Sequence, residues 1–127
     1  MLTIIIIPTG KKRTEELIES FAGIPANVVL LEDGKLDFNV KVSTAWKIFM
    51  YEGEFLSKEL QEALPVYLES GKDFDVFSIY KMSTSSGAFI APRLFKAEVE
   101  IRNDSVFPVG VPQEKQNTIL DGFILGV

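Results

Sequence analysis

Two short apolar runs, separated by an amphipathic segment, open the chain and predict a strand-helix-strand unit. Residues 2–7 form a continuous run rich in β-branched side chains that Pro8 closes, which is typical of a strand buried on both faces. Residues 14–21 carry apolar side chains at helical spacing, and we expect Thr14 to cap this helix. A second apolar run follows at residues 28–31. We therefore predict an α/β chain with a Rossmann-like start.

The middle of the chain again combines a strand with a helix. Residues 47–50 are a third strand candidate, and Ser57 precedes an apolar stripe at helical spacing. The stripe comprises Leu60, Leu64, Tyr67 and Leu68. Pro65 lies inside it and is expected to kink or divide the helix, because proline has no amide proton and clashes with the preceding turn.

The last third of the chain predicts strands of more antiparallel character. Residues 74–82 are rich in strand formers, and a polar loop of small residues follows at 83–87. Apolar and charged residues alternate over 95–101, which predicts a strand with one face in water. Residues 119–125 predict a last strand that Gly122 weakens or bends. The sheet is therefore expected to be mixed.

Composition narrows the class of protein. A chain of 127 residues with 46% hydrophobic content can bury one compact core, so residues 1–127 are predicted to form a single domain. No apolar run approaches the roughly 18 residues of a membrane span, and the N-terminal run is too short for a signal peptide. We therefore expect a soluble, cytoplasmic protein without a membrane span. The net charge of −5 provides no basic surface for nucleic acid.

The residues available for chemistry are few, because the chain contains neither cysteine nor histidine. Disulfides, thiolate metal sites and imidazole bases are excluded, which leaves carboxylates, lysine, tyrosine or water for acid-base chemistry. Polar groups follow three strand candidates: Thr9, the pair Glu32 and Asp33, and the segment 51–54. Ligands of open α/β sheets bind beyond the carboxyl ends of the strands, so we expect these groups to converge on one edge.

The segment 46–60 reads WKIFMYEGEFLSKEL and joins a strand candidate, two glutamates and a helix start. It resembles the metal-site segment of the family 2 glycosyltransferases, most closely the branch that includes lipopolysaccharide core enzymes. The matching positions are Trp46, Phe49, Met50, Glu54, Leu56, Ser57, Glu59 and Leu60. Tyr51 and Gly53 stand where the family places the two aspartates of its Asp-x-Asp motif.

Two further segments resemble the same family. The run IIIIPTGKKRTEELIESF, which contains Pro8 and Thr9, is similar to its opening strand, turn and helix. The run LLEDGK is similar to its second strand, which ends in Asp-Asp-Gly-Ser. The resemblance implies that Asp33, with its neighbours Glu32 and Gly34, contacts the nucleoside of a nucleotide-sugar, because a carboxylate accepts hydrogen bonds from ribose hydroxyls. A plain Glu-Asp-Gly turn is the alternative.

The resemblance also implies an altered metal site. The family's two aspartates hold Mn or Mg against a diphosphate, which Tyr51 and Gly53 cannot do. Glu52 and Glu54 lie two residues apart, so in an extended segment they would point to the same side and could hold the metal in their place. Glu54 is the candidate catalytic residue, and no metal ligand is assigned. The alternative is that both glutamates are solvated loop acids.

Cationic residues are the other means of holding a diphosphate. Arg93 in APRLFKAEVEI falls on the arginine of the family's Arg-Leu-Phe-Arg segment, where it would steer acceptor or phosphate, or only fix a loop. Lys11, Lys12 and Arg13 lie at a predicted helix start, where free amides favour anions. Ordinary solvated basic residues in an exposed turn are the preferred interpretation of these three.

Two departures from the family bear on function. Only eleven residues separate Gly34 from Trp46, where the family usually has many tens that complete the nucleotide pocket. The segment 111–113, Val-Pro-Gln, stands near the family's Val-His-Glu. We therefore expect a truncated glycosyltransferase A-type fold that binds a nucleotide-sugar or glycan, with its transfer chemistry altered. A non-catalytic structural or protein-interaction domain is the alternative, and ten phenylalanines are compatible with a homo-oligomer.

Overall fold

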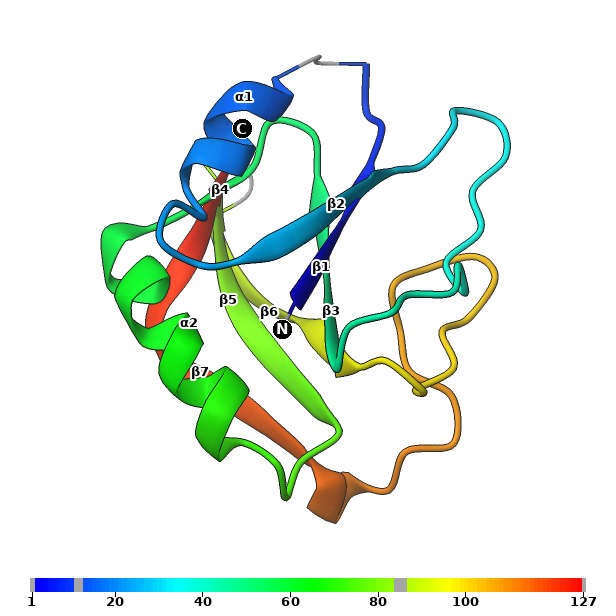
Figure 1. Cartoon of the computed structure of the whole chain (residues 1–127), viewed down its shortest axis with the longest axis vertical. Helices are drawn as coiled ribbons and strands as arrows, with labels where there is room; N and C mark the ends of the chain where they lie inside the picture. The colour runs from blue at the N-terminus through cyan, green and yellow to red at the C-terminus, as the bar shows by residue number, and fades with distance from the viewer. Residues whose placement is uncertain (1, 11–12, 84–86, 127) are drawn as a thin grey trace.

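The computed structural model describes residues 2–10, 13–83 and 87–126. Within these ranges the chain forms one seven-stranded sheet with two α-helices and a short 3₁₀ helix (Figure 1). The elements are β1 (Leu2–Ile7), α1 (Thr14–Glu19), β2 (Ala26–Leu30), β3 (Trp46–Tyr51), β4 (Phe55–Leu56), α2 (Lys58–Ser70), β5 (Val76–Ser83), β6 (Gly87–Lys96), η1 (Gln113–Lys115) and β7 (Gln116–Gly126). The predicted α/β class is confirmed.

The sheet is mixed, as predicted, and its strand order is β2-β1-β3-β6-β5-β7-β4. Strand β1 pairs in parallel with β2 on one side and with β3 on the other. Strand β6 lies antiparallel between β3 and β5, and β5 pairs in parallel with β7. The parallel part brings the carboxyl ends of β1, β2 and β3 to one edge, where the sequence places its polar clusters.

Strand β1 is buried on both faces, as its unbroken apolar run predicts. Ile4 and Ile6 belong to a core that includes the buried side chains of both helices. Ile5 and Ile7 belong to a second core that includes side chains from the segments 31–45 and 97–115. Figure 1 shows the two helices on one side of the sheet and the two long loops on the other.

Helix α2 begins as predicted and continues through its proline. The Ser57 hydroxyl accepts a hydrogen bond from the Leu60 amide at 3.2 Å, which caps the helix. The helix extends from Lys58 to Ser70 with Pro65 inside it, so of the two effects expected of Pro65, a kink or a division, the division is wrong. Buried Leu60 and Leu64 on one side of the proline, and partly buried Tyr67 and Leu68 on the other, hold both halves on the same core.

Helix α1 differs from the prediction at its first residue. Thr14 is the first helical residue, and Arg13 takes the cap position without a side-chain cap bond, so the assignment of Thr14 as cap is wrong. Arg13 instead pairs with Glu16 one turn later, at 2.8 Å. The candidates Lys11 and Lys12 lie outside the described residues. Neither α-helix of the described ranges is long and apolar enough to cross a membrane.

The strand predicted over residues 95–101 is wrong beyond its start. Strand β6 ends at Lys96, and the chain turns at residues 97 and 98. The buried ammonium of Lys47 donates hydrogen bonds to the carbonyls of Ala97 at 3.0 Å and Val99 at 2.8 Å. The carbonyls of Ala97 and Val99 therefore bind the Lys47 ammonium and do not pair with a neighbouring strand. The pKa of Lys47 is lowered, because the effect of burial outweighs the opposite effect of the nearby Glu98 charge.

The two remaining strand predictions hold with changed limits. Ser83 ends β5 and Gly87 begins β6, so the loop predicted over 83–87 is shorter, and its residues 84–86 lie outside the described ranges. Strand β7 contains the predicted segment 119–125, and Gly122 bends it with a φ of +101°. Its pairing with β5 is irregular between Ile79 and Lys81.

Candidate functional site

A cleft of about 460 Å³ lies at the carboxyl ends of β1 and β3. Its walls come from the turn 51–54, from β5 and β6, and from residues 105 and 106 of the long loop. The charged residues that line it are Glu52, Glu54, Lys81 and Arg93. The cleft thus joins two of the three polar clusters that the sequence predicts, and it adds Lys81, which the sequence analysis missed.

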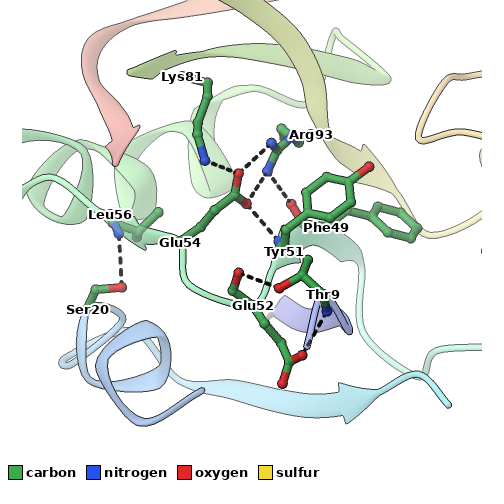
Figure 2. A network of polar contacts seen from close by, with 9 residues as sticks. All are labelled: Thr9, Ser20, Phe49, Tyr51, Glu52, Glu54, Leu56, Lys81 and Arg93. Carbon is green, nitrogen blue, oxygen red and sulfur yellow. Dashed lines mark hydrogen bonds and ion pairs between the residues drawn. The ribbon is translucent and has the colours of Figure 1, made fainter. Parts of the chain in front are cut away.

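The turn 51–54 separates the two glutamates. The Glu54 amide donates a hydrogen bond to the Tyr51 carbonyl at 3.0 Å, and Gly53 takes a φ of +89° inside this turn. A residue with a side chain is disfavoured at that φ, so the turn requires glycine at this position. Figure 2 shows Glu52 and Glu54 pointing in opposite directions. The expectation that they point to the same side is wrong, because the segment is a turn and not an extended strand.

Glu54 is the centre of a buried ionic group, which we call the Glu54 cluster and which comprises Glu54, Lys81 and Arg93 (Figure 2). Arg93 donates to both carboxylate oxygens, at 2.8 and 2.9 Å, and Lys81 pairs with the Oε2 atom. The Tyr51 amide donates to Oε1 at 2.7 Å. Glu54 and Arg93 are each 4% exposed. Both oxygens of Glu54 are therefore already bound within the protein.

Arg93 is fixed by the protein as well. It also donates to the Phe49 carbonyl at 3.1 Å, and its guanidinium carbon lies 5.1 Å from the centre of the Tyr51 ring. The ring face adds a cation-π contact to the ion pair. The sequence left open whether Arg93 steers a ligand or fixes a loop, and these contacts favour the fixing role. From its buried position on β6, Arg93 thus holds both β3 and the turn 51–54.

The contacts of Glu54 set the direction of its titration. Burial by itself raises the pKa of a carboxyl group, but the hydrogen bonds from Arg93, its charge, and the bonds from Lys81 and Tyr51 outweigh burial. The pKa of Glu54 is therefore lowered. A carboxylate that is hard to protonate is a weak base, so this environment suits an ionised structural group better than a proton acceptor.

We expect this lowered pKa to make the protein less stable in acid. The ionised form contributes stability above the unfolded pKa of about 4.3, and the contribution is lost as the pH falls through the lower folded pKa. Urea unfolding measured from neutral pH to well below pH 4.3 should therefore show a steep loss that Glu54→Gln removes in part. Equal pH dependence of the two proteins would contradict the role given to Glu54.

Glu52 and Thr9 confirm the convergence of the first and third polar clusters. The Thr9 and Gly10 amides donate to Glu52 Oε1 at 2.8 and 3.3 Å, and the Thr9 hydroxyl donates to the Glu52 carbonyl at 3.1 Å. The second cluster lies beside them, because Glu32 and Asp33 line a hollow of about 410 Å³. The other residues of this hollow are Pro8, Gly10, Leu30, Leu31 and Glu52. Glu52 therefore borders both the cleft and this second hollow.

Asp33 and Gly34 belong to a tight turn as well. The Lys35 amide donates to the Glu32 carbonyl at 3.1 Å, and Gly34 takes a φ of +83°. The Glu-Asp-Gly turn that the sequence analysis gave as the alternative is therefore present. Glu32 and Asp33 nevertheless line the hollow. No lysine or arginine lines this hollow among the residues that the structure describes.

The pair Glu52 and Glu54 does not fit a divalent cation in this arrangement. Both oxygens of Glu54 bind cationic side chains, and Glu52 accepts backbone amides on the other side of the turn. Within the described ranges, no group of three or more carboxylates gathers at one point. Mn or Mg at these glutamates would require the ion pairs of Glu54 to open first.

The sequence analysis missed two residues of the cleft, Lys81 and Phe89, and only Lys81 left a signal in the sequence. Lys81 is the one charge in the apolar run 76–82, and it shares a strand face with Phe77 and Ile79. A lone charge on a buried strand face requires a partner, and Glu54 is that partner. Phe89 lines the cleft with 47% of its surface exposed, and its place in the sequence gives no sign of this.

The sequence matches no known protein-family model, and no curated protein is significantly similar to it. The function is therefore argued from the cleft itself.

Proposed function

We propose that this chain binds a saccharide in the cleft and does not transfer it. The observation that carries the proposal is the Glu54 cluster, in which the one candidate catalytic carboxylate is bound by two cations and a backbone amide. A group engaged in this way has no oxygen left for a metal and is a poor base. Binding without chemistry is the function that this arrangement supports best.

The charge of the cleft favours a neutral ligand. Two glutamates and two basic residues line it, so their formal charges cancel among the described residues. A diphosphate requires an excess of positive charge or a metal ion, and the cleft offers neither through these side chains. A sugar ring instead presents hydroxyl groups, which are uncharged donors and acceptors.

The groups still open to a ligand also suit a sugar. The Tyr51 hydroxyl and the Oε2 atom of Glu52 have no hydrogen-bond partner within the described part of the chain, and both residues line the cleft. The exposed ring of Phe89 gives an apolar surface beside them. One aromatic face with a few oriented polar groups is the usual composition of a small-molecule site.

A nucleotide-sugar is the second candidate, because Glu52 borders both the cleft and the hollow of Asp33. A sugar in the cleft and a nucleoside beside Asp33 would then occupy neighbouring sites. The phosphates between them would meet the Glu52 carboxylate, which disfavours this ligand without a metal ion. This second candidate is the ligand that the resemblance to family 2 glycosyltransferases implies.

We expect a neutral saccharide to raise the melting temperature with or without Mn. A ligand at about a hundred times its dissociation constant adds roughly 2.7 kcal/mol, which corresponds to on the order of 10 °C for a domain of this size. The panel contains neutral mono- and oligosaccharides, nucleoside diphosphates and nucleotide-sugars, each with and without Mn. Phe89→Ala should weaken saccharide binding by about tenfold or more, because the ring loses its contact.

Phe107→Ala is the matched control, since Phe107 is 51% exposed and does not line the cleft. A shift seen only with nucleotide-sugars and Mn would overturn the proposal in favour of a transferase, and Asp33→Ala should then abolish the shift. The absence of any shift would overturn both candidates and leave the structural or protein-interaction role.

A further inference from the structure

Strand β2 forms an uncharged and exposed edge of the sheet. It is the first strand in the order and pairs only with β1. Its sequence, ANVVL, contains no charged residue and no proline, although the whole chain has a net charge of −5. Val28 is 43% exposed and Leu30 is 57% exposed. Natural edge strands are usually protected by lysine, proline, bulges or a covering element, and β2 has none of the first three within its bounds.

The outer side of β2 carries backbone groups that can pair. The Leu31 amide donates to the Ile6 carbonyl at 3.0 Å, so the odd-numbered residues of this segment face β1. Backbone groups alternate in direction along a strand, so the amides and carbonyls of Ala26, Val28 and Leu30 point away from β1. These groups form a template for one more strand.

The opposite end of the sheet is a very short strand. Strand β4 is only two residues long, and its Leu56 amide donates to the Ser20 hydroxyl at 3.0 Å. Leu56 is 4% exposed. Strand β4 pairs with β7 only at Ile124 and Leu125, so among the described residues β2 is the one end strand of the sheet that is longer than two residues. Two copies that pair through the same edge form an isologous contact, which closes on itself and so stops at the dimer.

We propose that two copies of this chain pair along β2 as an antiparallel, two-fold symmetric dimer. Symmetry about Val28 places each Val28 opposite its counterpart and Ala26 opposite Leu30 of the second copy, because Ala26 and Leu30 lie equally far from Val28 along the strand. These are the residues whose backbone groups point outward, so the pairing uses the available donors and acceptors. Val28 and Leu30 of both copies come together on the same face.

The charges beyond β2 are compatible with this register. Glu32 falls opposite Ile24 of the second copy and Asp33 opposite Gly23, because each pair sums to 56. No like charges therefore face each other across the two-fold axis. An edge of five residues covers less area than the about 1,600 Å² of a standard stable interface. The dimer should accordingly be reversible and should depend on concentration.

Sedimentation equilibrium of the full chain across a dilution series tests the proposal. We expect the average mass to rise from 14.2 kDa toward twice this value as concentration increases. Hydrogen exchange should slow at the Val28 and Leu30 amides over the same range. Val28→Lys should give a monomer at every concentration, because two like charges would then face each other across the axis.

Leu120→Lys is the matched control, because Leu120 on β7 is 72% exposed and the change adds the same charge. It should leave the dimer intact. Leu30→Lys gives a second test on the same edge if Val28→Lys fails to fold, as judged by circular dichroism and melting temperature. A wild-type chain that stays monomeric, a Val28→Lys or Leu30→Lys variant that folds and still dimerises, or assembly beyond the dimer would each overturn the proposal.

Discussion

Glu54→Gln should lower the free energy of unfolding by about 3–5 kcal/mol, because it leaves two buried cations without their anion. Lys81 is 7% exposed and Arg93 is 4% exposed, so water cannot replace the lost carboxylate without a change of structure. The amide keeps the shape of the side chain, which limits the loss of packing. The measured change therefore reports mainly on charge.

Urea unfolding at neutral pH is the measurement, with Glu62→Gln as its control. Glu62 is exposed on α2, and its loss of charge should change the free energy of unfolding by no more than about 0.5 kcal/mol. A double variant that also replaces Lys81 by methionine should recover part of the loss, because one unpaired charge is then removed. A single Glu54→Gln variant as stable as the control would mean that the cluster contributes little.

Gly122→Ala is expected to cost about 2–6 kcal/mol, through two causes that add. The backbone φ of +101° disfavours any side chain, which costs about 1–3 kcal/mol. A Cβ atom at this position would lie 2.4 Å from the Leu60 backbone nitrogen, in the first turn of α2. Helix and strand would have to separate there, and such overpacking costs a further 1–3 kcal/mol or so.

Gly110→Ala separates these two causes. Gly110 has a φ of +72°, and a Cβ atom placed there meets nothing within 4 Å. Its replacement should therefore show the cost of backbone conformation alone, about 1–3 kcal/mol. Thermal or urea unfolding of both variants gives the difference. If the two cost the same, the contact between Gly122 and α2 is looser than the structure indicates.

The parallel part of the fold could be predicted from the sequence because its signals are local. The run 2–7 is buried on both faces, which only a central strand allows, and the segment 46–51 has the same character. Ser57 and the apolar stripe after it describe α2 completely enough to place its first turn. Each of these elements is stabilised by the same residues that predict it from the sequence.

The failures arise where a distant residue decides the local structure. The alternation over 95–101 predicts a strand, but Lys47 binds the carbonyls of Ala97 and Val99 from another strand. The Glu54 cluster likewise joins residues 54, 81 and 93, which no spacing along the chain reveals. The opposite orientations of Glu52 and Glu54 depend on the left-handed φ of Gly53, which a strand periodicity cannot include.

The Glu54 cluster also bears on how the chain finds one arrangement among several similar ones. Strands β5 and β6 form a long hairpin, and Lys81 and Arg93 lie on its two arms. A slip of one residue in either arm would turn its cation to the opposite face and leave Glu54 buried with an unmatched charge. An apolar contact would tolerate such a slip far better than an ion pair does. The cluster therefore specifies the register of the hairpin, because a misaligned sheet would bury an unpaired charge and have a higher free energy.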